Sequence, residues 1–149
     1  MRLADFIKAE AVFFRFESRE KAAILDAMVS ACCTAEGIAC YDKVRHAVFA
    51  READRSTGIG RGLAVPHCRS DEVDDFTIGV AALQDGVDWD ALDGGPVQFI
   101  FLVIGPSDKP ETYLQLLSQI SRIMRVPDAP RRLLAASAPH QIIDIIQNL

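Results

Sequence analysis

The sequence predicts one α/β domain, over residues 1–149, in which α-helices flank a mixed β-sheet. Two observations lead to this prediction. Short runs of β-branched and aromatic residues in the middle of the chain are separated by turn signals, which is typical of paired strands. Longer segments with apolar residues at helical spacing precede and follow these runs. Half of the 149 residues are hydrophobic, which is enough for one buried core, and no repeat or linker divides the chain.

The N-terminal part of the chain supplies the first strand and the first helix. Ala11–Phe16 is rich in aromatic residues and predicts a short strand. Ser18 then provides an N-cap oxygen for a helix that begins at Arg19 and ends at Gly37. The apolar face of this helix is expected to pack on the sheet and consists of Ile24, Leu25, Met28, Val29 and Cys32.

A second helix is predicted over residues 41–53. It places Val44, Ala47 and Val48 on or beside one face. Arg51 lies on or beside that face, near the C-terminal end, so a rigid element would hold its guanidinium. A solvated arginine at the end of a helix is the alternative for this residue.

A glycine-spaced segment, Arg55–Gly62, follows this helix and is predicted to be a loop. Leu63–His67 then predicts a short strand that Pro66 terminates. The G-x-G-x-G spacing follows a helix and precedes a strand, the reverse of the order in a dinucleotide-binding fold. No Gly-Lys-Ser/Thr follows the glycines, so a P-loop is excluded as well.

Two longer strands are predicted further along the chain, at Phe76–Leu83 and Val97–Ile104. Between them lie the turn signals Asp85-Gly86 and Asp93-Gly94-Gly95, which favour paired strands. The single tryptophan, Trp89, lies in this turn-rich segment, and we expect it to pack against the edge of the sheet.

Three helices complete the predicted domain. The first opens at Pro110, and the others span Pro127–Ala135 and Gln141–Leu149. The first of them has one apolar face, composed of Leu114, Leu117, Ile120 and Met124.

Composition and charge exclude several classes of protein. The chain has 16 basic and 21 acidic residues, a formal net charge of −5 and no block of Lys and Arg, so a nucleic-acid partner is not expected. The longest apolar run, Phe99–Ile104, is far shorter than the ~18 residues of a spanning helix, and no direct membrane insertion is expected. Charged residues among the first ten would interrupt a secretion signal, so we predict a cytoplasmic location.

The four cysteines indicate reduced thiols. Cys32 and Cys33 are adjacent, Cys40 and Cys68 stand alone, and none has the spacing of a zinc site. We expect them to fill the core. Redox sensitivity is the alternative for Cys68, because it directly follows His67.

His67 is the strongest candidate for chemistry. Pro66, with its fixed φ and missing N–H, ends the strand and directs the next side chain out of the sheet. Near neutral pH an imidazole leaves one ring nitrogen free to attack phosphorus, while a hydrogen bond holds the other. A surface histidine without a task is the alternative when this residue is considered alone.

The segment Ser56–His67 resembles the phosphorylation-site signature of the enzyme IIA (EIIA) family of the bacterial phosphoenolpyruvate-dependent phosphotransferase system (PTS), fructose, mannitol and nitrogen-regulatory type. The residues that carry the resemblance are Ser56-Thr57-Gly58-Ile59-Gly60-Arg61-Gly62-Leu63-Ala64-Val65-Pro66-His67. Similarity extends over nearly the whole chain, including Ala50–Glu52, Asp85–Gly95 and Pro106–Leu117. The resemblance implies one PTS EIIA type 2 domain with the mixed α/β fold of the phosphotransferase and anion-transport proteins.

The resemblance also implies a reaction. His67 would accept a phosphoryl group from a histidine of a small phosphocarrier, HPr or its nitrogen-branch relative. In this family the arginine that matches Arg51 lies beside the phosphoryl site. Transfer between two imidazoles needs hydrogen-bond donors and a cation, which Arg51, Ser56 and Thr57 would supply. Turn capping is the alternative role of Ser56 and Thr57. This chemistry requires no metal or other cofactor, and no carboxylate or histidine spacing suggests a metal site.

Tyr113 departs from the family, whose members commonly place a second histidine at this position near the start of the long helix. A tyrosine hydroxyl donates a hydrogen bond but cannot present two titratable ring nitrogens. We therefore expect Tyr113 to act as a substitute donor to the phosphoryl group.

Charged residues flank His67 in the sequence. Four arginines and four carboxylates occur nearby, namely Arg51, Arg55, Arg61, Arg69, Asp71, Glu72, Asp74 and Asp75. A basic phosphoryl pocket with an acidic rim would attract a basic carrier. An ordinary solvated turn is the alternative.

The sequence and the resemblance together predict a phosphoryl-accepting regulator of the nitrogen type, whose phospho and dephospho forms bind different regulatory target proteins. No membrane or transfer domain is present in the sequence, which favours this class. The first alternative is a free-standing fructose- or mannitol-type component that passes phosphate to a cysteine of enzyme IIB. The second is an interaction module that has lost phosphotransfer, for which Tyr113 is the evidence. Whether the chain acts as an enzyme, as a phosphotransferase component, stays open.

Overall fold

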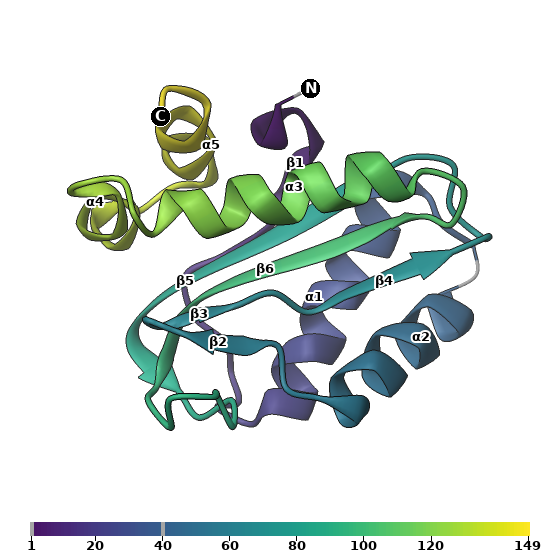
Figure 1. Ribbon diagram of the computed structural model, residues 1–149, viewed down its shortest axis with the longest axis horizontal. Coiled ribbons are helices and arrows are strands. Elements are labelled where there is room, and N and C mark those ends of the chain that lie inside the picture. The colour runs from purple at the N-terminus through teal and green to yellow at the C-terminus, as the bar shows by residue number, and fades with distance from the viewer. Residues whose placement is uncertain (1, 40) are drawn as a thin grey trace.

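The computed structural model describes residues 2–39 and 41–149 and confirms a mixed β-sheet with helices on both faces (Figure 1). Cys40, for which the sequence predicts a reduced and packed thiol, lies outside the described residues. Among the described residues, no helix is both long and apolar enough to cross a membrane. The elements in chain order are η1 (Leu3–Phe6), β1 (Ile7–Phe13), α1 (Lys21–Glu36), α2 (Tyr41–Asp54), β2 (Gly58–Gly60), β3 (Leu63–Ala64), β4 (His67–Ser70), β5 (Thr77–Val87), β6 (Val97–Pro106), α3 (Pro110–Ile123), α4 (Ala129–Ala135) and α5 (Pro139–Gln147).

The sheet is built around an antiparallel pair, β5 and β6. Its order is β1-β5-β6-β3-β2, and β4 pairs with β6 beyond the end of β3. β1 runs parallel to β5, whereas β3 and β4 both run parallel to β6. The chain therefore pairs with β6 twice in succession, once before and once after Pro66, and His67 opens the second stretch opposite Val103.

Two apolar cores cover the two faces of the sheet. One lies beneath η1, α3, α4 and α5, and the other beneath α1 and α2 (Figure 1). Alternate strand residues point into opposite cores, as the period of two in a strand requires. Val80 and Phe101 pack in the first core, while their neighbours Ala81 and Ile100 pack in the second. Helices on both faces explain why β5 and β6 are almost continuously apolar.

The boundaries at the N-terminus differ from the prediction. The strand begins and ends earlier than Ala11–Phe16, and α1 begins at Lys21 rather than Arg19. Ser18 does not cap the helix: its Oγ accepts the N–H of Glu20, whose backbone is extended and which occupies the N-cap position. The predicted end of the helix is confirmed, because Gly37 takes the left-handed conformation with φ +66°.

The glycine-spaced segment is not entirely a loop. Gly58–Gly60 forms β2, which pairs with β3 in an antiparallel hairpin. The predicted strand Leu63–His67 is split, because Pro66 has no N–H to continue the ladder. The carbonyl of Pro66 still accepts the N–H of Val103 at 3.0 Å, so the chain resumes pairing at once.

The Asp85-Gly86 pair is not a turn. It lies inside β5, where the pairing register with β6 shifts between Ala82 and Val87. Gly86 has φ +65°, which a glycine adopts without steric cost in such a bulge. β5 therefore continues to Val87, well beyond the predicted end at Leu83.

The buried face of α3 also differs from the predicted one. Tyr113, Leu116, Ile120 and Ile123 are buried, whereas Leu114 is 65% exposed. Successive helical residues are about 100° apart around the axis, so only one of Tyr113 and Leu114 can face the sheet. The sequence prediction chose the leucine, and the aromatic residue faces inward instead. The last two helices, α4 and α5, are displaced from their predicted limits by about one helical turn or less.

Candidate functional site

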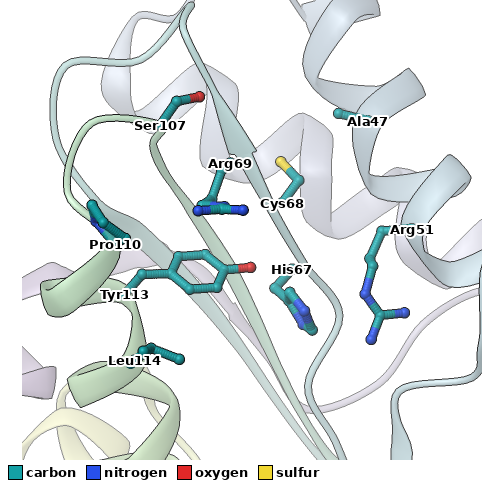
Figure 2. Close-up of a pocket in the computed structure, with 9 residues that line it drawn as sticks. All are labelled: Ala47, Arg51, His67, Cys68, Arg69, Ser107, Pro110, Tyr113 and Leu114. Atoms are coloured by element: carbon teal, nitrogen blue, oxygen red, sulfur yellow. The ribbon is translucent and has the colours of Figure 1, made fainter.

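His67 lies at the first position of β4, and its placement follows from the residues just before it. Because β4 is paired with β6 from this residue onward, its backbone is held rigidly. The side chain is half-buried and reaches an open cavity of about 720 Å³ (Figure 2). The histidine is therefore both fixed and accessible, as expected from its position after Pro66.

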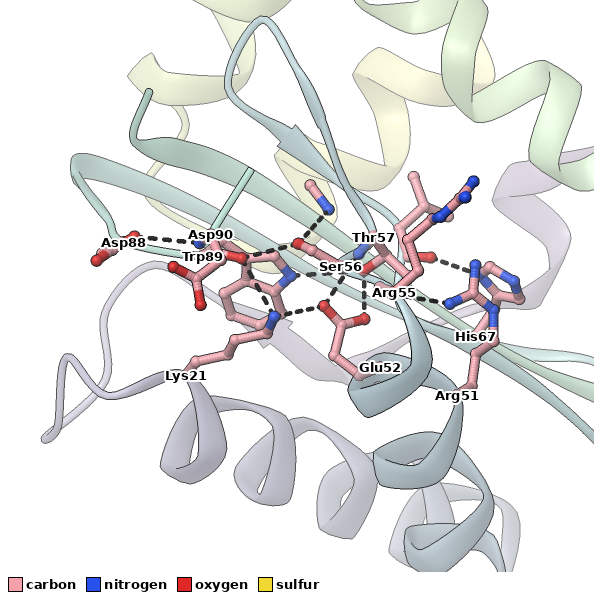
Figure 3. A network of polar contacts seen from close by, with 12 residues as sticks. Lys21, Arg51, Glu52, Arg55, Ser56, Thr57, His67, Asp88, Trp89 and Asp90 are labelled. Carbon is pink, nitrogen blue, oxygen red and sulfur yellow. Dashed lines mark hydrogen bonds and ion pairs between the residues drawn. The ribbon is translucent and has the colours of Figure 1, made fainter. Parts of the chain in front are cut away.

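One ring nitrogen of His67 is already engaged. Nδ1 lies 2.6 Å from the carbonyl oxygen of Val65 (Figure 3). A carbonyl can only accept a hydrogen bond, so Nδ1 carries the proton and Nε2 keeps its lone pair. The backbone thus selects the tautomer in which Nε2 is the nucleophilic nitrogen.

The surroundings of His67 keep the ring uncharged. Burial lowers the pKa of His67 below its ordinary value of 6.5, and the positive charges of Arg51 and Arg69 act in the same direction. The hydrogen bond to Val65 and the carboxylate of Glu52 oppose this shift without reversing it. At neutral pH the imidazole is therefore neutral and nucleophilic.

Three elements line the cavity around His67. They are α2, β4, and the start of α3 together with the loop that leads into it. The lining residues are Ala47, Arg51, His67, Cys68, Arg69, Ser107, Pro110, Tyr113 and Leu114 (Figure 2). The fold thus brings together parts of the chain that are far apart in the sequence.

Arg51 is in the last turn of α2, and its side chain points toward His67 (Figure 2). Its Nη1 donates to the carbonyl oxygen of Arg55 at 2.9 Å, which ties the guanidinium to the start of the following segment. Arg69, two residues after His67, supplies a second guanidinium to the cavity. Of the other two arginines near His67 in sequence, Arg55 is exposed and Arg61 is held near Asp93 through its backbone N–H.

Tyr113 contacts His67 directly. The two rings meet edge to face, with centroids 5.6 Å apart and an interplanar angle of 69°. The guanidinium carbon of Arg69 lies 5.8 Å from the centre of the Tyr113 ring. Burial raises the pKa of the Tyr113 phenol well above its ordinary value, so its hydroxyl remains protonated and able to donate.

Ser56 and Thr57 do not line this cavity. Ser56 Oγ donates to the carbonyl oxygen of Trp89 at 2.9 Å and accepts the N–H of Gly58. Thr57 Oγ1 donates to Glu52 Oε2 at 2.6 Å, and its N–H donates to Glu52 Oε1 at 3.0 Å (Figure 3). Both hydroxyls are therefore engaged in holding the segment after α2, the alternative role considered for them.

The cysteines near the site are packed. Cys68 is buried, and burial raises the pKa of its thiol to about 12, so it remains a thiol. Cys32 and Cys33 are buried in the same core as Cys68. Within residues 2–39 and 41–149, no group of three or more His, Cys, Asp or Glu side chains is arranged to hold a metal ion.

Acidic residues lie next to the cavity. Asp71, Asp74 and Asp108 line a neighbouring hollow, and Ser107 borders both spaces. All three carboxylates are exposed. The surface thus places acidic groups beside a cavity that carries two arginines, and the attraction of a basic carrier stays a prediction.

Comparison with known proteins identifies the family. The family described as phosphoenolpyruvate-dependent sugar phosphotransferase system, EIIA 2, matches residues 5–149. The chain belongs to this family. The nitrogen regulatory protein of Pseudomonas aeruginosa is 40% identical to this EIIA chain over 104 residues, which cover 68% of each protein.

Two further relatives of this EIIA chain extend the comparison. The fructose-specific EIIABC component of Bacillus subtilis is 31% identical over 146 residues, which cover 98% of this chain but 23% of that much longer protein. The crystal structure of nitrogen regulatory protein IIA-Ntr from Neisseria meningitidis has a TM-score of 0.88 at 24% identity, covering 97% of this chain and 98% of that one. This structure confirms the predicted PTS IIA fold.

The sequence prediction did not single out Glu52, which lies behind the candidate site (Figure 3). Glu52 is buried, although it follows the predicted site residue Arg51 directly. The signal was present, because Val44, Val48 and Glu52 recur every fourth residue and form one inward stripe of α2. A carboxylate in such a stripe predicts a paired, buried charge.

Proposed function

We propose that this EIIA domain is a phosphoryl-accepting regulator of the nitrogen type, phosphorylated on Nε2 of His67 by an HPr-like phosphocarrier. Its phospho and dephospho forms bind different regulatory target proteins. The identity to the Pseudomonas aeruginosa nitrogen regulatory protein supports this choice within the family. The observation that carries the proposal is the neutral imidazole itself, with Nδ1 engaged by Val65 and Nε2 left free beside two arginines.

The proposed step transfers phosphorus between two imidazoles. The nitrogen–phosphorus bond of the carrier's phosphohistidine breaks while Nε2 of His67 forms a new one. Nδ1 keeps its proton, so the His67 ring gains positive charge, which the carbonyl oxygen of Val65 stabilises. The carrier's phosphohistidine is protonated on its other ring nitrogen in this step, so its imidazole leaves uncharged and keeps that proton, and no further reactant is needed.

Three side chains are proposed to bind the phosphoryl group. Arg51 and Arg69 offset the charge that develops on its oxygens, and the Tyr113 hydroxyl donates a hydrogen bond to it. The N-terminus of α3, at Pro110, adds a partial positive charge on the same side of the cavity. Ser56 and Thr57 are left out of this set, because their hydroxyls are engaged elsewhere.

The direct test is phosphorylation in solution. The protein is incubated with phosphoenolpyruvate, enzyme I and an HPr-like carrier, and its intact mass is measured. We expect a gain of one phosphoryl group, and omission of the carrier should prevent it. An unchanged mass, under conditions that label a control EIIA, would contradict the proposal.

A second candidate is a fructose- or mannitol-type component that passes phosphate to a cysteine of enzyme IIB. The observation that favours it is the similarity over 98% of this chain to the Bacillus subtilis fructose-specific component. The two functions differ in the fate of the phosphate. A phosphorylated sample that rapidly loses its label to an IIB protein supports the sugar component, and one that keeps its label supports the regulator.

A third candidate, an interaction module without phosphotransfer, rests on the tyrosine at position 113, where family members commonly have a histidine. The role of its hydroxyl yields a prediction. If its hydroxyl donates to the phosphoryl group, Tyr113→Phe should slow transfer by about tenfold, the effect of losing one hydrogen bond to a charged group. Tyr113→His, which restores the residue common in the family, should transfer at least as fast as the wild type. Initial rates of ³²P transfer measure both effects. Equal rates for the wild type and Tyr113→Phe would remove the hydroxyl from the proposed site.

The depressed pKa of His67 predicts a pH dependence. Only the neutral ring has a free lone pair on Nε2, so acceptance is lost as pH falls through the pKa of His67. Because this pKa lies below 6.5, the rate should stay constant across neutral pH and fall only in more acidic solution. Single-turnover transfer rates over a pH series, with the carrier's own titration measured separately, test the direction of the pKa shift of His67. An inflection above 6.5 would contradict it.

A further inference from the structure

A buried polar network lies behind the site, between α1, α2 and the segment that leads to β2 (Figure 3). Its centre is the carboxylate of Glu52, whose Oε1 lies 2.7 Å from Nζ of Lys21. Lys21 also donates to the carbonyl oxygen of Trp89 at 3.1 Å and lies 5.1 Å from the centre of its indole ring. The indole Nε1 donates in turn to Thr57 Oγ1 at 3.4 Å.

The two oxygens of Glu52 have distinct tasks. Oε1 accepts from Lys21 and from the backbone N–H of Thr57, and Oε2 accepts the Thr57 hydroxyl. The carboxylate therefore has three donors, one of which is the cationic Lys21, and this is the pairing that a buried charged group requires. It fixes the backbone of Thr57 at the point where the chain leaves α2 and approaches the sheet.

From Thr57, a chain of hydrogen bonds reaches the reacting imidazole. The carbonyl oxygen of Thr57 accepts the N–H of Val65 at 3.0 Å. The carbonyl oxygen of Val65 accepts the Nδ1 proton of His67 at 2.6 Å. Each link joins segments separated by a turn or a strand boundary, so a shift of Thr57 would be passed to the bond that sets the tautomer of His67.

Glu52 also controls the other side of the site. It occupies the last turn of α2, next to Arg51, and its burial fixes the rotation of that turn about the helix axis. With Glu52 facing inward, Arg51 points toward His67 (Figure 3) and lines the cavity. The buried carboxylate of Glu52 thus influences the positions of both Arg51 and the His67 imidazole.

We propose that Glu52 is a positioning residue for phosphoryl acceptance, acting through Thr57 and Val65 on the tautomer of His67 and through the last turn of α2 on Arg51. It does not touch the reacting atoms. This inference deepens the proposed function and rests on it for the transfer step, but the effect on the imidazole exists without any phosphate.

The charge of Glu52 has a second effect. It acts on the ring in the direction that raises the pKa of His67, which means that it favours a positive imidazole. The ring gains positive charge once Nε2 bonds to phosphorus while Nδ1 keeps its proton. Loss of the carboxylate should therefore disfavour the phosphorylated state as well as the approach to it.

The test uses Glu52→Gln in the full chain, because the amide keeps the shape of the side chain and one acceptor but loses the charge. Imidazole ¹⁵N–¹H spectra should show a single Nδ1–H tautomer of His67 in the wild type and a mixture of tautomers in the variant. Phosphoryl transfer from the carrier should fall by about tenfold or more, as expected when reacting groups are misplaced. The inflection in its pH profile should move to lower pH.

Glu36→Gln is the matched control, because Glu36, at the end of α1, is ion-paired with Lys8 of β1 and lies outside the network. It should leave the spectra and the rate unchanged. A merely structural role of Glu52 would lower the melting temperature but leave the His67 tautomer and the transfer rate at the wild-type values, and that result overturns the inference. If Glu52→Gln does not fold, Thr57→Val replaces it: it removes only the hydroxyl between Glu52 and Trp89, and the same two readouts should change in the same direction.

The outcomes separate this inference from the proposed function. If the wild type takes no phosphate from the carrier, the proposed function fails. The effect of Glu52→Gln on the tautomer of His67 then tests the positioning role of Glu52 without a transfer rate. If the wild type is labelled and Glu52→Gln has the wild-type spectrum and rate, the proposed function stands and the inference fails.

Discussion

We expect His67→Ala to abolish phosphoryl acceptance completely. Among residues 2–39 and 41–149, the side chain that the alanine lacks is the one that places a free ring nitrogen in the cavity beside Arg51 and Arg69. Transfer makes a bond to this atom, so its removal leaves no acceptor rather than a slower one. Intact mass after incubation with phosphoenolpyruvate, enzyme I and carrier measures the result, with an expected gain of zero against one phosphoryl group for the wild type.

The other two histidines of the sequence provide matched controls for this experiment. His46 is exposed on α2, and His140 is exposed in the first turn of α5. Alanine at either position should leave the gain of one phosphoryl group unchanged. Full labelling of His67→Ala, or loss of the label in His46→Ala, would move the phosphorylation site away from β4 and end the proposed mechanism. Circular dichroism spectra establish that each variant folds.

Arg51→Gln has the second largest expected effect. Removing one preorganised donor from a site where charge develops typically costs about 10²–10³ in rate, and Arg51 supplies a full positive charge besides. We expect single-turnover transfer from the carrier to slow by about 10²-fold, with the final extent of labelling reduced less than the rate. Arg69, on the other wall of the cavity, remains to bind the phosphoryl oxygens.

Arg45→Gln is the control on the same helix. Arg45 pairs with Asp26 through Nε at 2.8 Å and lies outside the cavity, so its loss should leave the transfer rate within about twofold. A rate for Arg51→Gln as high as that of Arg45→Gln would show that the guanidinium of Arg51 plays no part in transfer. Its contact with the Arg55 carbonyl would then be its whole role.

The prediction for Arg51 also bears on Glu52, because both effects depend on the last turn of α2. If Glu52 acts partly by directing Arg51, the double variant with Glu52→Gln and Arg51→Gln should transfer faster than the product of the two single effects implies. If Glu52 acts only through the imidazole, the two effects should multiply. Rates for the four proteins of this cycle distinguish the two routes.

Local sequence was sufficient for much of the fold. The helix stop at Gly37, the Pro110 start of α3, and the apolar strands β5 and β6 each follow from short-range signals. The sequence predictions were wrong where one local signal is compatible with two structures. Asp85-Gly86 serves equally in a turn or in a bulge, and only the pairing of β5 with β6 selects the bulge.

At the candidate site, too, local sequence predicts some features and tertiary contacts decide others. His67 stands out in the sequence because of Pro66 and the signature around it, but its tautomer depends on a carbonyl that the strand break directs back to the ring. Ser56 and Thr57 carry donors suited to a phosphoryl group, and tertiary contacts with Trp89 and Glu52 engage them instead. Hydroxyl chemistry is local information, whereas the direction in which a hydroxyl points is not.

The sequence by itself determined the family, the class of fold, the histidine proposed to accept the phosphoryl group and the arginine expected beside it, because these depend on residue types at fixed short spacings. The tertiary structure alone decided which charges and hydroxyls meet at the histidine. It adds Arg69 to the predicted Tyr113 in the cavity and places Glu52 behind it. β4 and the start of α3 come together only after β4 has paired with β6 and the helices have packed on the sheet.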